Sequence, residues 1–548
     1  MNSVNACPIG MVFQKVLVTL LVGALSTAVT AVAQNNWEWK QNRDLLAGVV
    51  EGRIQTSIQA MEKIHLDYPD NMETIFGLAI AYARNGEDER AVAMARRSIE
   101  LGLPPERWLA GPRSLTGPVL ALDADFADEV RQLSSRLLHG PHLGDVQPDS
   151  IRVWGRLAPG VRQARIEAST DPQFGWVNAV SNSHHSNPDV ADAPTTFKLH
   201  LQGLTPGTTY FYRLAADSHH ITSPEFHFRT ADTLSTSRPV RIVFGGGAAY
   251  EPQYERMWKT IDLKKPDMLF LLGDNVYIDQ PLLPDIQKYC YFRRHSSKPY
   301  RDLLAHTPVY AIWDDHDFST NDSWGGPLVG QPAWKSHVLQ VFKDNWINPA
   351  YGISPDNPGC FFSFSHRDID FFFLDGRYYR TDPKVDNPSM LGPDQLAWLK
   401  SALLQSKATF KVLASPVPFA PGVKPGSLDP WDGFPKERNS ILDFILQNQI
   451  AGVLLISADR HRSDIWKFPR PGSRNSFEFH EFSSSRLTNI HTHSIMKNSL
   501  FGYNSKCSFG LMEFNLNDSQ PSITYSIHSI DSEEVYKRRV TLSELIPE

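Results

Sequence analysis

The chain has 548 residues, a formal net charge of −6 and an apolar content of 41%. This length and composition predict two to four domains with sizeable cores, and they exclude a disordered, collagenous or coiled-coil chain. The slightly acidic balance and the lack of a long basic run argue against nucleic-acid binding through a broad positive surface. Any phosphate group that the protein handles must therefore be bound locally.

The N-terminus carries a processing signature. Lys15 precedes an apolar run, Val16 to Ala33, which ends in small residues before Gln34. This pattern predicts a signal peptide over residues 1–33 that is cleaved off, and hence an exported protein, periplasmic or extracellular. The run approaches the length of a bilayer span, so an N-terminal membrane anchor that stays attached is the alternative. No later run is long and apolar enough to span a membrane.

Cysteine usage gives little guidance. Cys7 would leave with the signal peptide, whereas Cys290, Cys360 and Cys507 lie far apart in the mature chain. Such spacing predicts neither a disulfide framework nor a zinc module. One disulfide beside one free thiol stays open, and the sequence does not select the pair.

Residues 34–138 have a helical pattern. Small and apolar residues recur at helical spacing from Thr74 to Ile99, and the break at Asn85-Gly86 divides them into a helix pair. The pair resembles one tetratricopeptide (TPR) unit, but stacked repeats need neighbours and one clear unit is visible. We therefore expect a small helical accessory domain, with a protein partner at this region as the alternative.

Residues 139–232 change to a period of two. Segments such as Ser150 to Leu157 and Phe197 to Leu201 alternate apolar and polar residues between Pro, Gly and Asp turns, which predicts a β-sandwich. The segment Leu204 to Leu214 resembles a fibronectin type III-like strand with its corner tyrosine. Such domains position other parts of a protein, so we assign no chemistry to this one.

From residue 236 to 548, apolar strands alternate with helices, which predicts a layered α/β domain. The expected strands include Val240 to Gly245, Met268 to Leu272, Tyr310 to Trp313, Asp368 to Leu374, Phe410 to Ala414, Gly452 to Ser457 and Glu478 to Phe482. Ligands of open α/β sheets bind outside the carboxyl ends of the strands, so residues that follow these strands are candidates for a site.

Acidic residues follow two of these strands. The strand Met268 to Leu272 ends in Gly273-Asp274, and the strand Tyr310 to Trp313 leads into the run Asp314 to Asp317. Carboxylates this close together repel each other, so they would stay ionised only beside a cation, most simply a metal ion.

Three further strands also end in residues suited to a ligand site. They are followed by Asp375-Gly376-Arg377, by Asp459-Arg460-His461 and by the small-residue turn Gly246-Gly247. A glycine turn lets backbone approach a ligand closely.

Together these motifs resemble the PhoD-like alkaline phosphatases, which belong to the wider calcineurin-like metallophosphoesterase class. The matching segments are Leu272 to Tyr277, Trp313 to Asp317, Leu374 to Arg380, Met390 to Leu399 and Ala458 to His461. The resemblance covers about Gly140 to the C-terminus, because these proteins also carry a β-sandwich before the catalytic domain. It implies a metallophosphatase-like β-sandwich flanked by helices, which hydrolyses phosphomonoesters, phosphodiesters or both.

The resemblance also implies metal ligands. Asp274 matches the aspartate that bridges the metals, and Tyr277 matches a tyrosinate ligand that marks ferric iron in the family. The other matching positions are Asp315, Asn321, Asp459 and His461. Oxygen ligands of these types are hard, and they suit iron together with calcium, or magnesium or manganese in its place.

One position departs from the family pattern. The family commonly has a Ser-Cys pair after the first strand, with the cysteine bound to iron, whereas Gly247 stands at that place here. Either the iron has one ligand fewer or another group or metal takes over. Ala458 also replaces a usual glycine, a change expected to shift backbone more than chemistry.

The predicted chemistry is hydrolysis by a metal-activated hydroxide that attacks phosphorus in line. His316 is the candidate acid for the leaving alkoxide, since an imidazole can cycle near neutral pH. Arg377 is the candidate phosphate clamp, and a buried ion pair with Asp375 is an equally good interpretation. We expect Asp314, Asp317 and Asp375 to orient the ligands from behind.

A second hypothesis comes from another class: an interaction protein that uses the helical and β-sandwich domains and whose phosphatase domain has lost catalysis. Gly247 favours it slightly. The otherwise complete acidic set opposes it, because so many unpaired carboxylates in one crevice would be destabilising without a metal. The sequence leaves open the ester class, the natural substrate and the oligomeric state.

Overall fold

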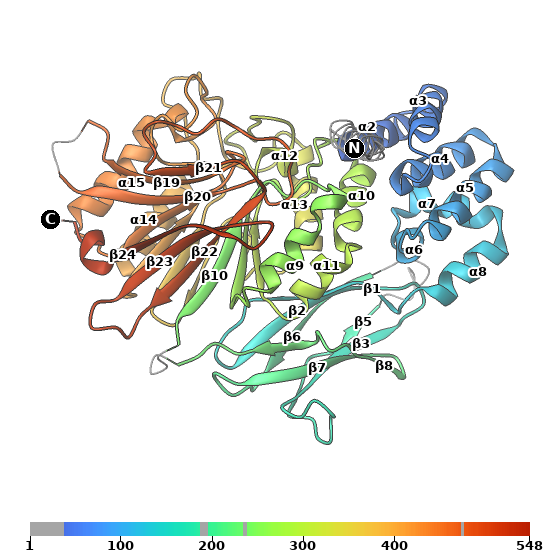
Figure 1. The fold of residues 1–548 in the computed structure, drawn as a ribbon, viewed down its shortest axis with the longest axis horizontal. Helices are drawn as coiled ribbons and strands as arrows, with labels where there is room; N and C mark the ends of the chain where they lie inside the picture. Colours follow the sequence, from blue (N-terminus) through green and yellow to red (C-terminus); the bar gives the residue numbers. More distant parts are fainter. Residues whose placement is uncertain (1–37, 187–194, 234–237, 473–475, 548) are drawn as a thin grey trace, which may run out of the picture.

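The computed structural model describes residues 38–186, 195–233, 238–472 and 476–547. The predicted signal peptide, residues 1–33, lies outside the described residues. Figure 1 shows N-terminal helices in blue, a β-sandwich in cyan and green below them, and a large α/β part that fills the rest of the chain. The predicted mixed α/β architecture with an N-terminal helical region is confirmed.

The helical region consists of short antiparallel helices. They are α2 (Glu38–Val50), α3 (Ile54–Asp67), α4 (Met72–Asn85), α5 (Asp88–Glu100), α6 (Glu106–Ala110), α7 (Arg113–Leu122) and α8 (Ala124–Leu133). The side chain of Asn71 caps α4 by accepting a hydrogen bond from the backbone N–H of Thr74 at 3.0 Å. Gly86 ends this helix with φ of 77°, a left-handed conformation that suits glycine. The helix pair is therefore confirmed, and its likeness to a TPR unit stays a prediction.

Two sheets form the β-sandwich part. One has the order β1 (Leu137–Gly144), β2 (Ser150–Leu157) and β6 (Thr195–Gln202). The other has the order β4 (Ala179–Val180), β3 (Gln163–Ser169), β7 (Thr209–Ala216) and β8 (His219–Ile221). In addition, β5 (His184–His185) pairs with β3, and β9 (His227–Arg229) pairs with β7. The hydroxyl of Tyr210 accepts a hydrogen bond from the backbone N–H of Thr205 at 3.0 Å, as expected of a corner tyrosine. The fibronectin type III-like type of this sandwich stays a prediction.

The first sheet of the α/β part has six strands in the order β12-β11-β10-β22-β23-β24. Parallel strands β10 (Val240–Gly245), β11 (Met268–Leu272) and β12 (Val309–Ile312) make up one half, as predicted. Antiparallel strands β22 (Ser508–Asn515), β23 (Ser522–Ser529) and β24 (Glu534–Thr541) make up the other half. The apolar runs predicted no strand after Phe482, so this second half was not expected.

The second sheet has seven strands in the order β15-β16-β17-β18-β20-β19-β21. Their bounds are β15 (Phe362–His366), β16 (Ile369–Phe373), β17 (Phe410–Ala414), β18 (Val453–Ser457), β19 (Ser463–Pro469), β20 (Glu478–Ser484) and β21 (Phe501–Tyr503). Aromatic rings join the two sheets: Phe270 of β11 lies 5.2 Å from Phe371 and 4.9 Å from Phe373 between ring centroids. The sheets therefore pack face to face over a buried aromatic core.

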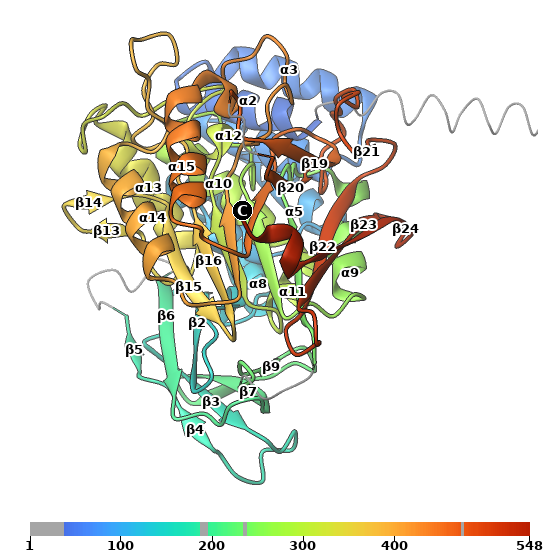
Figure 2. The same cartoon turned by 90° about the vertical axis from the view of Figure 1, so that its left-hand side faces the viewer.

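Helices cover this pair of sheets (Figure 2). Leu399 of α14 (Pro393–Gln405) and Ile441 of α15 (Pro435–Gln447) are buried in one core with residues of the second sheet. The other helices of this part are α9 (Arg256–Asp262), α10 (Pro284–His295), α11 (Lys298–Leu304), α12 (Asp315–Phe318) and α13 (Trp334–Asn345). A small hairpin, β13 (Gly352–Ser354) and β14 (Asn357–Pro358), and three short 3-10 turns complete the described elements.

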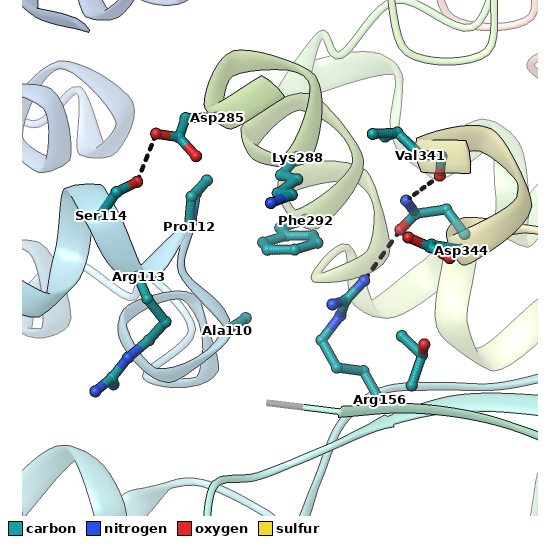
Figure 3. A pocket seen from close by; sticks show the side chains of 12 residues that line it. Ala110, Pro112, Arg113, Ser114, Arg156, Asp285, Lys288, Phe292, Val341 and Asp344 are labelled. Carbon is teal, nitrogen blue, oxygen red and sulfur yellow. Dashed lines mark hydrogen bonds between the residues drawn. The ribbon is translucent and has the colours of Figure 1, made fainter. Parts of the chain in front are cut away.

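Helix α10 lies where the three parts meet. A cavity of about 400 Å³ opens there, between α7, the sandwich residue Arg156 and α10 (Figure 3). The hydroxyl of Ser114 on α7 donates to Asp285 on α10 at 2.5 Å. The helical region is thus in direct polar contact with the α/β part.

Cys290, Cys360 and Cys507 are buried free thiols in the described residues, so the disulfide that the sequence left open does not form here. Within the ranges given above, the helices are all too short or too polar to span a bilayer.

Candidate metal centre

The carboxyl ends of the parallel strands from both sheets meet at one edge of the molecule. Gly246, which follows β10, forms a parallel bridge with Ser485, which follows β20. Asp274 follows β11, Asp315 follows β12 and Asp459 follows β18. The acidic residues that the sequence placed after separate strands therefore converge, as expected for a site at the strand ends.

Several residues at this edge have a left-handed backbone. The φ angles are 55° for Asp274, 51° for Tyr277, 52° for Asp279, 62° for Asp459 and 48° for His461. Non-glycine residues adopt this conformation when the surrounding structure fixes it, and they cluster at functional sites. The backbone N–H of Ala248 donates to the carbonyl of Asp274 at 2.8 Å, so the turn after β10 supports the first acidic turn.

Asp274, Asp315 and His316 form a group suited to a cation. Each offers one ligand atom, and these atoms lie within 4.8 Å of one another. Asp274 is 3% exposed, and its Oδ1 has no hydrogen-bond partner among the described residues. An unsatisfied buried carboxylate oxygen is costly, and a cation would satisfy it. These residues therefore fit a metal ion.

A second group shares one residue with the first. Ligand atoms of Asp315, Asp322 and Asp429 also lie within 4.8 Å of one another. Asp322 donates its backbone N–H to Asp315 Oδ2 at 2.6 Å. Sequence reasoning identified neither Asp322 nor Asp429, because neither follows a strand directly.

Electrostatics support the need for a cation. Burial raises the pKa of Asp274 well above its usual range, and the neighbouring Asp315 and Asp314 raise it further, although His316 lowers it. Burial likewise raises the pKa of Asp314 well above its usual range, with opposition from Arg377. Asp314 has the guanidinium of Arg377 at 2.6 Å as its compensating charge, whereas Asp274 would take up a proton unless a metal ion kept it ionised.

Tyr277 lies deep in the site. Its phenol oxygen accepts a hydrogen bond from Asn489 Nδ2 at 2.7 Å, and its backbone carbonyl accepts one from Arg43 Nη1 at 2.8 Å. Burial, followed by Asp274, raises the pKa of Tyr277 well above its usual range. A phenolate at this position would therefore need a cation beside it.

His316 is held by a carboxylate that sequence reasoning missed. Its Nδ1 lies 2.5 Å from Asp279 Oδ1, which fixes a proton on that nitrogen. Burial opposes the charged form, but Asp315, Asp274 and Asp279 together raise the pKa of His316 well above its usual range. Asp279 lies two positions after Tyr277, at the end of the same turn.

His461 approaches the first group from the second sheet. Its Nε2 lies 4.0 Å from Asp274 Oδ2, and its Nδ1 is buried without a hydrogen-bond partner in the described part of the chain. Burial, then His493 and His491, lower the pKa of His461 well below its usual range. A neutral imidazole is the form that binds metals.

A cavity of about 410 Å³ opens at this centre. Asn321 is exposed and lines it together with Asp459. Its remaining lining residues are Lys40, Asp274, Tyr277, Asp279, Asp315, His316, Asp322, Lys424, His461, Asn489, His491 and His493. The six ligand positions implied by the family resemblance therefore all border one cavity.

Arg377 lies behind the cavity instead of facing it. Its side chain is fully buried, with Nε donating to Asp314 at 2.6 Å and Nη1 donating to Asp429 at 2.8 Å. This geometry favours the ion-pair interpretation, but the partners are not the expected Asp375. Asp375 accepts hydrogen bonds from Trp313 Nε1 at 2.8 Å and from the backbone N–H of Arg377 at 2.8 Å.

Asp317 supports the turn that carries Asp274. Its carboxylate accepts hydrogen bonds from the backbone N–H groups of Asn275 at 2.9 Å and Val276 at 3.0 Å. Burial raises the pKa of Asp317 to about 6, although the backbone hydrogen bonds from Asn275 and Val276 lower it. The expected orienting role thus corresponds to a direct contact with the turn after β11.

The two departures from the family pattern are adjacent. Gly247 has φ of 68°, and a Cβ added there would lie 2.9 Å from the backbone nitrogen of Arg486. A Cβ on Gly246 would lie 2.6 Å from the Cβ of Ala458. The turn therefore has no room for a cysteine at position 247 without rearrangement. The methyl group of Ala458 fits because Gly246 has no side chain.

Sequence reasoning also missed site residues on a loop and on helix α2. Asn489, His491 and His493 follow β20, so the rule that polar residues after strands form the site could have found them. Lys40 and Arg43 lie on α2, more than 200 residues before β11, and no local motif marks them.

The fold and site define a two-sheet α/β protein with a buried acidic centre at the strand ends. Residues 242–525 match the family model described as "PhoD-like phosphatase", and residues 124–232 match "PhoD-like phosphatase, N-terminal domain". The chain belongs to the PhoD-like phosphatase family.

Two curated relatives are phosphatases by name. "Alkaline phosphatase D" of Bacillus subtilis (strain 168) is 26% identical over 379 residues, which cover 59% of this chain and 64% of that protein. "Purple acid phosphatase 15" of Arabidopsis thaliana is 25% identical over 214 residues, which cover 37% of each chain. The chain thus spans less than two thirds of the length of these relatives. A solved structure titled "Structure of PhoD" shares the fold with a TM-score of 0.60 and 20% identity, over 73% of this chain and 88% of that chain.

Proposed function

We propose that the chain is a metal-dependent phosphoric ester hydrolase that acts on phosphomonoesters, phosphodiesters or both. One observation carries the proposal: Asp274, Asp315 and His316 bring ligand atoms within 4.8 Å of one another, beside a cavity of about 410 Å³. Membership of the PhoD-like phosphatase family supports the same reaction class. Gly247 slightly favours the catalytically degenerate alternative, but the complete acidic set opposes it more strongly.

The residues proposed to hold the metal ions are Asp274, Tyr277, Asp315, Asn321, Asp459 and His461, with Asp322 and Asp429 as additional candidates. When bound, such ions act as Lewis acids on a phosphoryl oxygen and make water a stronger acid. Carboxylate, phenolate and imidazole donors suit iron with calcium, magnesium or manganese. The lack of a thiolate at Gly247 leaves the iron site, if formed, with oxygen and nitrogen donors only.

His316 borders the same cation group as Asp274 and Asp315, but we assign the metal there to the two carboxylates and proton donation to the leaving group to His316. The contact between its Nδ1 and Asp279 fixes one proton there, so the transferable proton is the one on Nε2. His316 lines the cavity, which is a requirement for contact with the ester. Arg377 is proposed to hold Asp314 and the candidate ligand Asp429 in place, and not to clamp phosphate.

The proposed location is outside the cytoplasm, by way of the signal peptide over residues 1–33. This part of the proposal is independent of the chemistry. N-terminal sequencing of the exported protein tests it, with a start at Gln34 as the expected result.

The chemistry is tested by hydrolysis of nitrophenyl phosphate and bis(nitrophenyl) phosphate. We expect turnover of at least one ester, loss of turnover on chelation, and recovery when iron plus calcium, or another metal pair, is added back. The ratio of the two rates defines the preferred ester class. Absence of turnover under every metal supplement would refute the proposed function.

A further inference from the structure

Helix α2 precedes both segments matched by the family models, yet it reaches the metal centre. Arg43 on this helix is 1% exposed. Its Nη1 donates to the carbonyl oxygen of Tyr277 at 2.8 Å and to Asp279 Oδ2 at 2.5 Å. Lys40, one helical turn earlier, lines the cavity.

Asp279 connects this helix to His316. One carboxylate oxygen of Asp279 accepts from Arg43, while the other faces the Nδ1 of His316 at 2.5 Å. A buried guanidinium that pairs with a carboxylate fixes the orientation of that carboxylate. The carboxylate in turn fixes the tautomer and the ring orientation of the histidine, as in other carboxylate–histidine pairs.

Helix α4 contacts both α2 and α10. The hydroxyl of Thr74 on α4 donates to Asn42 Oδ1 on α2 at 2.8 Å. Glu73 on α4 accepts hydrogen bonds from Arg107 at 2.6 Å and from the hydroxyl of Tyr289 on α10 at 2.7 Å. Figure 1 shows α2 and α4 beside α10, which belongs to the α/β part. These contacts are buried. The position of Arg43 therefore depends on the packing of the helical region against α10.

We propose that Arg43 is a positioning residue of the active site, which sets the geometry of His316 through Asp279 and makes helix α2 part of the catalytic apparatus. The inference rests on the proposed function, because it concerns the delivery of a proton to the leaving group. It gives the helical region a role in catalysis, in place of the accessory or partner-binding role suggested by its sequence.

The test compares two monoesters that differ in their need for an acid. Phenolate, the leaving group of phenyl phosphate, is a poor one and needs protonation by an acid. Nitrophenolate leaves with little need for an acid. In the full-length protein, Arg43→Met should lower kcat for phenyl phosphate about 10-fold to 100-fold, with a smaller loss for nitrophenyl phosphate and little change in KM. Arg43→Lys, which keeps a positive donor, should recover part of the loss. Equal losses on both esters would overturn the inference.

Ser114→Ala is the matched control. It removes another polar contact between the helical region and α10, the hydrogen bond to Asp285, and lies away from the metal centre. Its kcat should equal that of the wild type on both esters. If Ser114→Ala lost activity with the same preference for phenyl phosphate, general loosening of the helical region would explain the Arg43 effect, and the inference would be wrong.

A double-mutant cycle separates positioning from packing. If Arg43 acts through Asp279, then Arg43→Met should have little further effect in an Asp279→Asn background. Independent, additive losses would contradict the proposed connection. Should Arg43→Met fail to fold, Arg43→Gln replaces it in the same cycle.

A measurement without turnover distinguishes this inference from the proposed function. In protein with 15N-labelled histidine rings, a hydrogen-bonded Nδ1–H of His316 should give a strongly downfield proton resonance, assigned by its loss in His316→Gln. The resonance should shift or disappear in Arg43→Met and persist in Ser114→Ala. If the wild type hydrolyses neither ester, the proposed function fails, and this resonance alone decides whether Arg43 positions His316. An unchanged resonance in Arg43→Met would refute the inference.

Discussion

Asn489 donates a hydrogen bond from its Nδ2 to the phenol oxygen of Tyr277 at 2.7 Å, across 212 positions in the sequence. Asn489 is itself anchored, because its Oδ1 accepts the backbone N–H of His491 at 2.8 Å. The bond joins the loop after β20 in one sheet to the turn after β11 in the other. It therefore orients the lone pairs of the phenol oxygen relative to the metal centre.

Replacement of Asn489 should weaken metal binding at Tyr277. Groups that orient metal ligands typically contribute 10-fold to 100-fold in metal affinity or activity, so we expect Asn489→Leu to lose metal to a chelator about 10-fold to 100-fold more readily. Competition with a chelator, followed by elemental analysis, measures this. Asn357→Leu is the control, since Asn357 is remote and bonds the exposed Asp394. Equal metal retention in Asn489→Leu and the wild type would show that the bond has no such role.

Arg377 should contribute to stability more than to substrate affinity. Arg377→Met leaves Asp314 without its buried guanidinium partner, whereas Asp429 keeps Arg380 at 3.0 Å; loss of one partner from a buried pair costs about 3–5 kcal/mol. Denaturant unfolding measures the change in the free energy of unfolding. Arg152→Met serves as the control, because Arg152 is 38% exposed and pairs with Asp145 at 3.1 Å, a surface contact worth about 0–1 kcal/mol. Wild-type stability with a raised KM would instead support the phosphate clamp.

A cysteine at position 247 should not restore the family's ligand. Gly247 has φ of 68°, and a Cβ there approaches the backbone of Arg486 to 2.9 Å, so any side chain strains the turn. We expect Gly247→Ala and Gly247→Cys to lose similar stability, about 1–3 kcal/mol each. Thermal unfolding and elemental analysis of both variants test this. A cysteine variant that is as stable as the wild type and holds more iron than the alanine variant would contradict this account of the turn.

Buried histidines between the sandwich and α10 should make stability depend on pH. His142 of β1 stacks on Trp154 with ring centroids 4.7 Å apart, and His139 and His295 lie beside it. Burial, followed by the nearby Arg301 and Arg156, lowers the pKa of His142 to about 3. The histidine pKa in the unfolded chain is about 6.5. Between this pH and about pH 3, the unfolded chain therefore binds a proton at His142 that the folded chain excludes. The stability that depends on the neutral His142 is fully present above pH 6.5 and is lost progressively as the pH falls below that value.

His142→Phe should remove one such group. Relative to pH 7.5, the variant should lose about 2 kcal/mol less than the wild type by pH 5, since each histidine contributes about 1.4 kcal/mol per pH unit in this window. Urea unfolding at the two pH values, followed by tryptophan fluorescence, gives the difference. Parallel losses in both proteins would mean that His142 does not exclude its proton in the folded state.

Part of the site was predictable because its residues follow buried strands. Apolar runs such as Met268–Leu272 mark strands, and the acids Asp274, Asp315 and Asp459 come directly after them. Asp429 lies in a loop with no strand before it, so its approach to Asp315 depends on the tertiary path of the chain. Arg43 reaches Asp279 across 236 positions, and no periodicity in α2 indicates it.

The fold shows the same division. The parallel strands were predicted because they are continuous apolar runs. The edge strand of the first sheet, β24, was not predicted. It carries charged residues along its length, so it resembles a surface segment until its pairing with β23 is known. Charged side chains on an edge strand discourage pairing with other chains. The same charges that make β24 hard to predict therefore protect the edge of the sheet.

The central claim is that the acids at the strand ends hold metal ions. Elemental analysis of the purified wild type and Asp274→Asn after identical metal loading and desalting tests it most directly. The account predicts transition metal near one equivalent per chain in the wild type and a large loss in the variant, because the variant lacks the carboxylate whose buried oxygen has no protein partner among the described residues. No bound metal in the wild type, or equal metal in both proteins, would contradict it.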